Sequence, residues 1–457
     1  MSTVVPKDTY VMSYGVFYLL GIMLVVPHFF YLNAFDFWMY RFDENRINNR
    51  KNMNSSLITL GNKFSMTPFN KDIVLRPAKI ILFRSFEEDI KVNSDTGSTD
   101  RNRFQVNVTS ALSLNFQTLM LLCLIFFLMY CKKLPPPERR LTCCLCSISI
   151  IFSFSIIITQ IRATSRPPVL FSITMVVTTI LNCLSGTAMA TLYELITEFP
   201  TKCLIYLQCG QCICGILAGI LRIALIPTCM RQDQITAIYF SFGSFIMISV
   251  TIYYCYVVKT SKFFIYSISQ MGEQQDERLL KRVKLKKVLN KGKWFYAAIF
   301  FAYGTTHAVN PGLLILVLPT IADSYWKKIY FVPVITLLGF HGFLLLGREL
   351  SRLIKTPKNG LILFIFSVLR IIFVPLFIFC NARPRKGLPV YFEDNDYIII
   401  MAVFGITEGI LVIKSLLAML PLFEGDERKA AMIFVPLVSA SALTAGSMIN
   451  VLITNMI

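Results

Sequence analysis

The chain has 457 residues, of which only 16% are charged and 55% are hydrophobic, and its formal net charge is +19. Soluble domains carry about a quarter charged residues, so this composition excludes an ordinary soluble protein. The basic residues lie between apolar stretches, which argues against a nucleic-acid partner and favours contact with anionic membrane lipid. Most of the thirteen cysteines lie inside the apolar stretches, so no disulfide framework is predicted.

Eleven apolar stretches follow one another along the chain, and each is long enough to cross a hydrocarbon core of about 30 Å as a helix. The first is too long for a signal-peptide core and has no small-residue cleavage site, so it should remain as the first span. The sequence therefore predicts an all-α polytopic membrane protein. The spans are predicted at 11–39, 105–131, 141–162, 168–199, 201–228, 235–258, 294–322, 328–350, 361–382, 395–421 and 429–456.

Two long polar segments interrupt the spans. The segment 41–104 contains Asn54-Ser55-Ser56, which fits the N-glycosylation pattern and predicts a glycoprotein. The segment 259–293 is basic, and residues 276–293 could form either an amphipathic helix on the membrane surface or a solvated linker. This segment divides the chain into an N-terminal six-helix bundle, 1–258, and a C-terminal five-helix bundle, 294–457.

Lysine and arginine are most frequent in the short loops after the second, sixth and eighth predicted spans. Such loops stay in the cytoplasm, so the N-terminus is expected inside and the C-terminus on the extracellular or lumenal side. Arg383, Arg385 and Lys386 lie after the ninth span and go against this orientation. We expect the plasma membrane rather than an internal membrane.

Several ionisable residues lie inside the predicted spans, where they are costly unless they face the bundle interior. A transport path and structural pairing between helices are equally good interpretations for those deepest in the spans. Glu198 and Arg348 lie near span ends, from which their side chains could reach the interface. Glu408 and Lys414 are on different faces of one helix, so each needs a partner elsewhere. The deepest residues are His28, Arg222, His341, Arg370 and Glu408.

Helix-breaking residues occur in the same stretches. Pro27 in the first span, Asn310-Pro311-Gly312 in the seventh and Pro375 in the ninth are predicted to interrupt their helices. Transporters use such breaks to present backbone groups to a solute, although each could be a simple kink. Asn310 is therefore a candidate solute contact.

The fifth span combines small, polar and sulfur-containing residues. Gly210, Gly215 and Gly219 are spaced for close helix packing, and Gln211 is a candidate interhelical or solute contact. Cysteines 209, 212 and 214 do not share one helical face, so a metal site is not expected. No catalytic motif is present, and neither an enzyme activity nor a cofactor is predicted.

Four motifs occur in a recognisable order. They are Leu20-Gly21 with Pro27-His28-Phe29-Phe30, Gly210-Gln211-Cys212-Ile213-Cys214-Gly215, Phe340-His341 with Gly347-Arg348, and Arg370-Ile371-Ile372-Phe373-Val374-Pro375 with Asn381-Ala382-Arg383-Pro384-Arg385. Together with eleven spans and long loops after the first and sixth, they make the chain resemble the equilibrative nucleoside transporter family over nearly its full length. The resemblance implies a bundle similar to the major facilitator fold, with six helices moving against five by alternating access.

The resemblance also implies positions for the solute site. Arg348 corresponds to the arginine that contacts the sugar, whereas Leu344 replaces an aspartate that accepts a sugar hydroxyl. His28 stands where the family has a tryptophan packed on the base. Met189 stands in place of a glutamine that contacts the base edge, and His341 in place of an asparagine.

The loss of an acid at Leu344 leaves Arg348 without its usual neighbour, so Glu194 or Glu408 is expected to balance it. Glu194, Glu408 and Arg222 are also candidates for proton coupling. The predicted function is facilitated transport of a small-molecule partner, a nucleoside or nucleobase, by a monomer. The alternatives are a proton-coupled carrier of nucleobases or another polar solute, motivated by three histidines, a residue type with an unperturbed pKa near 6.5, and a non-transporting receptor or scaffold with the same fold.

Overall fold

The computed structural model describes residues 12–34, 37–38, 103–130, 135–160, 167–228, 230–273, 285–321, 324–383, 385 and 387–457. Asn54 and nearly all of the segment 41–104 lie outside the described residues, so the predicted glycosylation stays a prediction. Residues 276–284 of the predicted surface helix lie outside them as well.

Eleven helical spans of the described chain are long and apolar enough to cross a membrane, which confirms the predicted number and order. The seventh, eighth and ninth spans each combine two α-helices, and the fourth, fifth and tenth each end in a short 3-10 turn. The main helices are α1 (Met12–Asn33), α5 (Arg103–Tyr130), α6 (Pro137–Gln160), α7 (Pro167–Leu195), α8 (Lys202–Leu225), α9 (Gln232–Thr260), α12 (Leu285–Val309), α15 (Phe340–Leu353), α16 (Gly360–Leu369), α18 (Asp394–Met419) and α19 (Gly425–Met456). The shorter helices are α10 (Lys262–Glu273), α13 (Gly312–Leu316), α14 (Tyr325–Phe331) and α17 (Phe373–Ile378).

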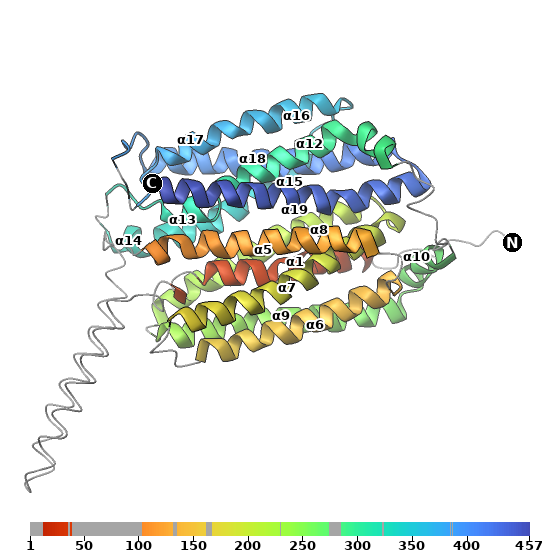
Figure 1. The fold of residues 1–457 in the computed structure, drawn as a ribbon, viewed down its shortest axis with the longest axis horizontal. Helices are drawn as coiled ribbons and strands as arrows, with labels where there is room; N and C mark the ends of the chain where they lie inside the picture. The colour runs from red at the N-terminus through yellow and green to blue at the C-terminus, as the bar shows by residue number, and fades with distance from the viewer. Residues whose placement is uncertain are drawn as a thin grey trace, which may run out of the picture.

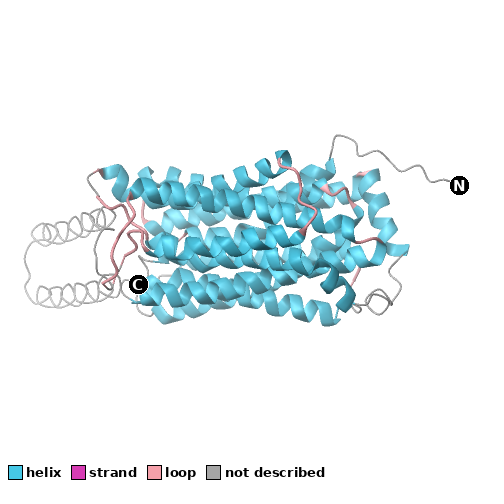
Figure 2. Cartoon of the chain, turned by 90° about the horizontal axis from the view of Figure 1, so that it is seen from above, coloured by secondary structure: helices cyan, strands magenta, loops and turns pink. Residues whose placement is uncertain are grey.

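The long helices run roughly along a common direction, and the described loops gather at the two ends of the bundle (Figures 1 and 2). Helices α1, α6, α7, α8 and α9 lie on one side, and α12, α15, α16 and α18 lie on the other (Figure 1). The two sides meet where α5 packs on α19 and where α8 packs on α15. The exact boundaries of a six-helix and a five-helix unit stay a prediction.

Close contact between α1 and α8 depends on two glycines. A Cβ atom at Gly21 would lie 2.1 Å from the Leu207 carbonyl oxygen, and one at Gly210 would lie 2.0 Å from the Tyr18 carbonyl oxygen. No side chain fits at either distance, so the small residues allow the two backbones to touch. The predicted packing function of Gly210 is therefore confirmed.

The predicted helix breaks have different outcomes. Helix α12 ends at Val309 and α13 begins at Gly312, which confirms the break at Pro311. The ninth span changes to a 3-10 turn at Arg370–Ile372, just where Pro375 removes a backbone hydrogen bond one turn back. The predicted interruption at Pro27 is wrong, because α1 is continuous from Met12 to Asn33. Its packing against α8 and α9 holds the helix together across the proline.

The basic residues before the seventh span also differ from the prediction. Residues 285–293 are not a separate surface helix but the first turns of α12. They pack against the start of α19, where Lys287 Nζ lies 3.1 Å from Glu427 Oε1 and Lys291 Nζ lies 3.8 Å from Glu427 Oε2. Val288, in the same turns of α12, is buried. The amphipathic helix of this loop is instead α10, at the end of the bundle opposite the last residue of α19 (Figure 1).

Candidate solute-binding site

A cavity of about 160 Å³ lies among helices from both sides of the bundle. Its wall combines residues of α1, α5, α7, α8, α12, α15, α18 and α19. Helices drawn from both ends of the sequence therefore share one site, as expected when a solute binds between two moving units.

Most of the site residues predicted from the sequence line this one cavity. They come from positions as far apart as the first and tenth spans. Their proposed functions in binding stay predictions. The eight residues are His28, Met189, Gln211, Asn310, His341, Leu344, Arg348 and Glu408.

Two predicted residues lie away from the cavity. Arg222 is buried in the last turn of α8 and does not belong to the cavity wall. Glu194 is paired with Arg140, whose Nη2 atom lies 2.5 Å from Glu194 Oε2, and Arg140 Nε also donates to Thr191 Oγ1 at 2.7 Å. The prediction that Glu194 could balance Arg348 is therefore corrected: the carboxylate joins α7 to α6.

Arg348 is deeper than its place near a span end suggested. Its side chain is only 3% exposed, and Nη1 donates a hydrogen bond to the Gln208 carbonyl oxygen on α8. Its Nε atom is buried without a partner among the described residues. By contrast, Glu198 does lie at a helix end, where Lys429 Nζ approaches its Oε1 atom to 2.7 Å. Arg348 thus brings a buried donor without a described partner into the cavity wall.

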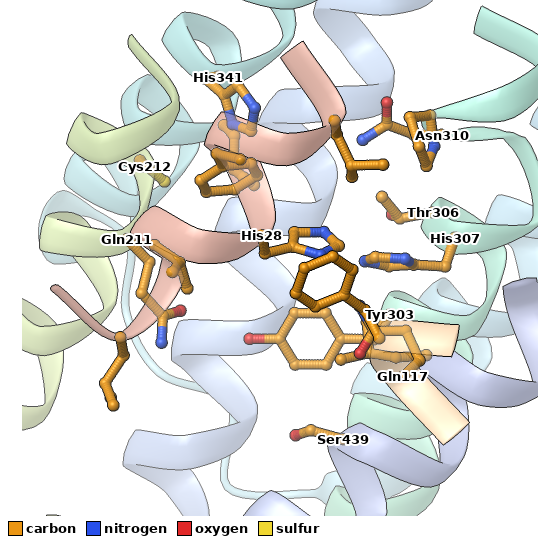
Figure 3. A pocket seen from close by; sticks show the side chains of 18 of the residues that line it. His28, Gln117, Gln211, Cys212, Tyr303, Thr306, His307, Asn310, His341 and Ser439 are labelled. Carbon is orange, nitrogen blue, oxygen red and sulfur yellow. The ribbon is translucent and has the colours of Figure 1, made fainter. Parts of the chain in front are cut away.

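Three histidines form part of the cavity wall. The ring centroids of His28 and His307 are 6.3 Å apart, and the two rings are tilted by 40°. The two imidazoles lie close together in Figure 3, and His341 lies farther along the wall. The Nδ1 atom of each is buried and has no hydrogen-bond partner among the described residues. His341 packs directly over Gly215, where a Cβ atom would lie 2.4 Å from the imidazole. Gly215 therefore makes room for His341 beside the cavity.

Gln208 links two tyrosines near Arg348. Gln208 Nε2 donates to the Tyr193 hydroxyl at 2.7 Å, and the Tyr303 hydroxyl donates to Gln208 Oε1 at 3.2 Å. Both tyrosines line the cavity. This hydrogen-bonded chain connects α7, α8 and α12 behind the guanidinium group of Arg348.

Sequence reasoning missed several polar lining residues, among them Gln117, Asn182 and Tyr303. Helical spacing could have found some of them. Asn182 lies seven residues before Met189 and therefore on the same face of α7, whereas Tyr303 lies seven residues before Asn310 on the seventh span. Once Met189 and Asn310 are candidates, these positions follow from the helical repeat.

The cavity leaves an unusual number of buried polar atoms without partners. Among the described lining residues, Asn33 Nδ2, Asn182 Nδ2, Gln211 Nε2 and the imidazoles add to Arg348 Nε. An unpaired buried polar group costs about 1–3 kcal/mol, so such a cluster indicates a site that a polar ligand completes. The described residues contain no group of three or more His, Cys, Asp or Glu side chains placed to hold a metal ion. A multi-pass helical membrane protein with this cavity has the features of a solute carrier.

Comparison with known proteins defines the class further. The nucleoside transporter family matches residues 269–455. The chain is 22% identical to equilibrative nucleoside transporter 1 of Homo sapiens over 443 residues, and 23% identical to that of Rattus norvegicus over 439 residues, with 89% of each chain covered in both cases. It is 30% identical to equilibrative nucleoside transporter 2 of Homo sapiens over 122 residues, 26% of each chain. The chain is therefore similar to equilibrative nucleoside transporters over most of its length, at low sequence identity.

Proposed function

We propose that the chain carries nucleosides across a membrane by alternating access, down their concentration gradient. The observation that carries this proposal is the cavity shared by helices from both sides of the bundle, with buried polar groups that lack partners. The names of the relatives supply the solute class. The plasma membrane, with the N-terminus in the cytoplasm and the C-terminus outside, is the proposed setting.

Contacts at the two ends of the bundle support the alternating mechanism. Near the end of α19, Ser110 Oγ donates to Asn450 Oδ1 at 2.9 Å, and the hydroxyls of Ser113 and Ser447 are 3.2 Å apart. Near its beginning, Lys429 is paired with Glu198. The first set joins the second span to the last one, and the second set joins the end of the fourth span to the last one, each with few polar bonds. Breaking one set while the other remains would expose the cavity to one side at a time.

Uptake into cells that lack their own nucleoside carriers tests the proposal. We expect saturable uptake of radiolabelled uridine, adenosine or inosine above the empty-vector level, because the relatives are named as nucleoside transporters and the cavity wall carries buried polar groups without described partners. Adenine measured in parallel would show whether a free base is also carried. Surface labelling of a tagged chain provides the expression control. No saturable uptake of any nucleoside by protein that has reached the surface would refute the proposed function.

A further inference from the structure

Glu408 reaches the cavity beside Arg348 because α18 packs very closely on α15. A Cβ atom at Gly409 would lie 2.5 Å from the Leu344 carbonyl oxygen and 2.7 Å from the Arg348 backbone nitrogen. Only a glycine fits there, so no side chain separates the two helices at this turn. Glu408, which precedes Gly409, is therefore held next to the turn of α15 that carries Arg348.

Neighbouring side chains fix one oxygen of the Glu408 carboxylate and leave the other without a hydrogen bond from the described residues. Thr306, on the cavity wall in Figure 3, donates to its Oε2 atom at 2.5 Å, and Arg370 Nη2 lies 3.7 Å from the same oxygen. Arg370 is itself fixed, because it donates to the Ala302 carbonyl at 2.7 Å and the Phe404 carbonyl at 3.0 Å. The other oxygen, Oε1, accepts no hydrogen bond from a described residue. One acceptor of a buried carboxylate is thus available.

Glu408 is also the one acidic side chain among the described residues that line the cavity. A sugar hydroxyl donates its strongest hydrogen bonds to a carboxylate, at roughly twice the strength of a neutral pair. Leu344, one turn before Arg348 on α15, cannot accept such a bond. The acceptor for a sugar must therefore come from another helix, and the unpaired Arg348 Nε supplies the complementary donor.

We propose that Glu408 accepts hydrogen bonds from the sugar hydroxyls of the solute, beside Arg348, and so makes the carrier selective for intact ribose. This inference rests on the proposed nucleoside transport. The competing interpretation is that Glu408 only neutralises Arg370 inside the bundle. A structural charge of that kind would affect every solute equally, whereas a hydroxyl acceptor affects only solutes that carry the hydroxyls.

The first arm of the test uses the unmodified protein. The KM values for uridine and for 2′,3′-dideoxyuridine are measured in the same cells. We expect the KM of the dideoxy compound to be about tenfold higher or more, because one charge-assisted hydrogen bond is worth at least that factor. Equal KM values, with uridine carried normally, would overturn this inference while leaving the proposed function intact. No uridine uptake at all would refute both.

The second arm assigns the selectivity to Glu408. Glu408→Gln keeps the size of the side chain but removes its charge, and the KM ratio between the two solutes should fall to about threefold or less. Glu408→Asp keeps the charge beside Arg370 but withdraws the oxygen from the cavity, so the ratio should fall here as well. Having two variants guards against one that fails to reach the membrane.

Glu194→Gln is the matched control, because it makes the same change in a carboxylate paired with Arg140 away from the cavity. Its KM ratio should equal that of the unmodified protein, even where total uptake is lower. A ratio that stays high in Glu408→Gln and Glu408→Asp would show that Glu408 serves only the ion pair, and would overturn the assignment.

Discussion

Arg348→Ala is expected to abolish uptake while the protein still reaches the cell surface. The guanidinium group is buried at the cavity, with its Nε unpaired and its Nη1 bonded to the Gln208 carbonyl. A hydrogen bond to a charged group contributes about 1.5–3 kcal/mol, so the loss of the bond that Nε would donate to the solute should alone lower kcat/KM about tenfold to hundredfold. The measurement is uridine uptake divided by the amount of surface-labelled protein.

Two further variants separate the binding function of Arg348 from a general effect of charge. Arg348→Lys keeps the positive charge but loses the planar guanidinium group, which can donate two parallel hydrogen bonds, so uptake should be only partly retained. Lys355→Ala removes an exposed charge just beyond α15 and should leave uptake unchanged. Normal uptake by Arg348→Ala would remove Arg348 from the site.

Arg370→Leu is expected to lower the stability of the bundle strongly. Arg370 and Glu408 are each about 3% exposed, and the substitution leaves the carboxylate buried without its cation. Breaking a buried pair in this way costs about 3–5 kcal/mol. Four hydrogen bonds that tie the ninth span to α12 and α18 are also lost. The check is the midpoint of thermal unfolding of the purified protein in detergent, which should fall markedly.

The double variant Arg370→Leu/Glu408→Leu identifies the cause. Removing both charges leaves no unpaired ion in the bundle, so the thermal midpoint should recover part of the loss seen in Arg370→Leu. If Arg370→Leu were as stable as the unmodified protein, the ion pair would not hold these helices together. If the double variant were no more stable than the single one, the lost hydrogen bonds rather than the unpaired carboxylate would be responsible.

The spans could be predicted well because hydropathy depends only on local composition. The break at Asn310-Pro311-Gly312 was also visible, since it combines a residue without an N–H group with one that has no side chain. Pro27 shows the limit of such reasoning. Whether a proline interrupts a membrane helix depends on its neighbours, and α8 and α9 lie far from it in the sequence.

The site could be predicted only in part. His28 and His341 were found because ionisable residues are rare inside a membrane, whereas Arg348 was assigned to the site through the resemblance of its motif to that of the family. Gln117 and Asn182 were missed because neutral amides are less conspicuous and carry no signal of which helix face is buried. Glu194 was assigned to the wrong partner for a similar reason. Its true partner, Arg140, is 54 residues away in the sequence and lies at the start of another helix.

Counterflow in proteoliposomes tests the central claim most directly. Vesicles that contain the purified protein are loaded with unlabelled uridine and diluted into labelled uridine at a low concentration, with no ion or pH gradient. A carrier that works by alternating access exchanges the two, so labelled uridine should accumulate transiently above its outside concentration. Arg348→Ala vesicles should show no accumulation. The absence of any transient in vesicles with the unmodified protein would contradict nucleoside transport by this chain.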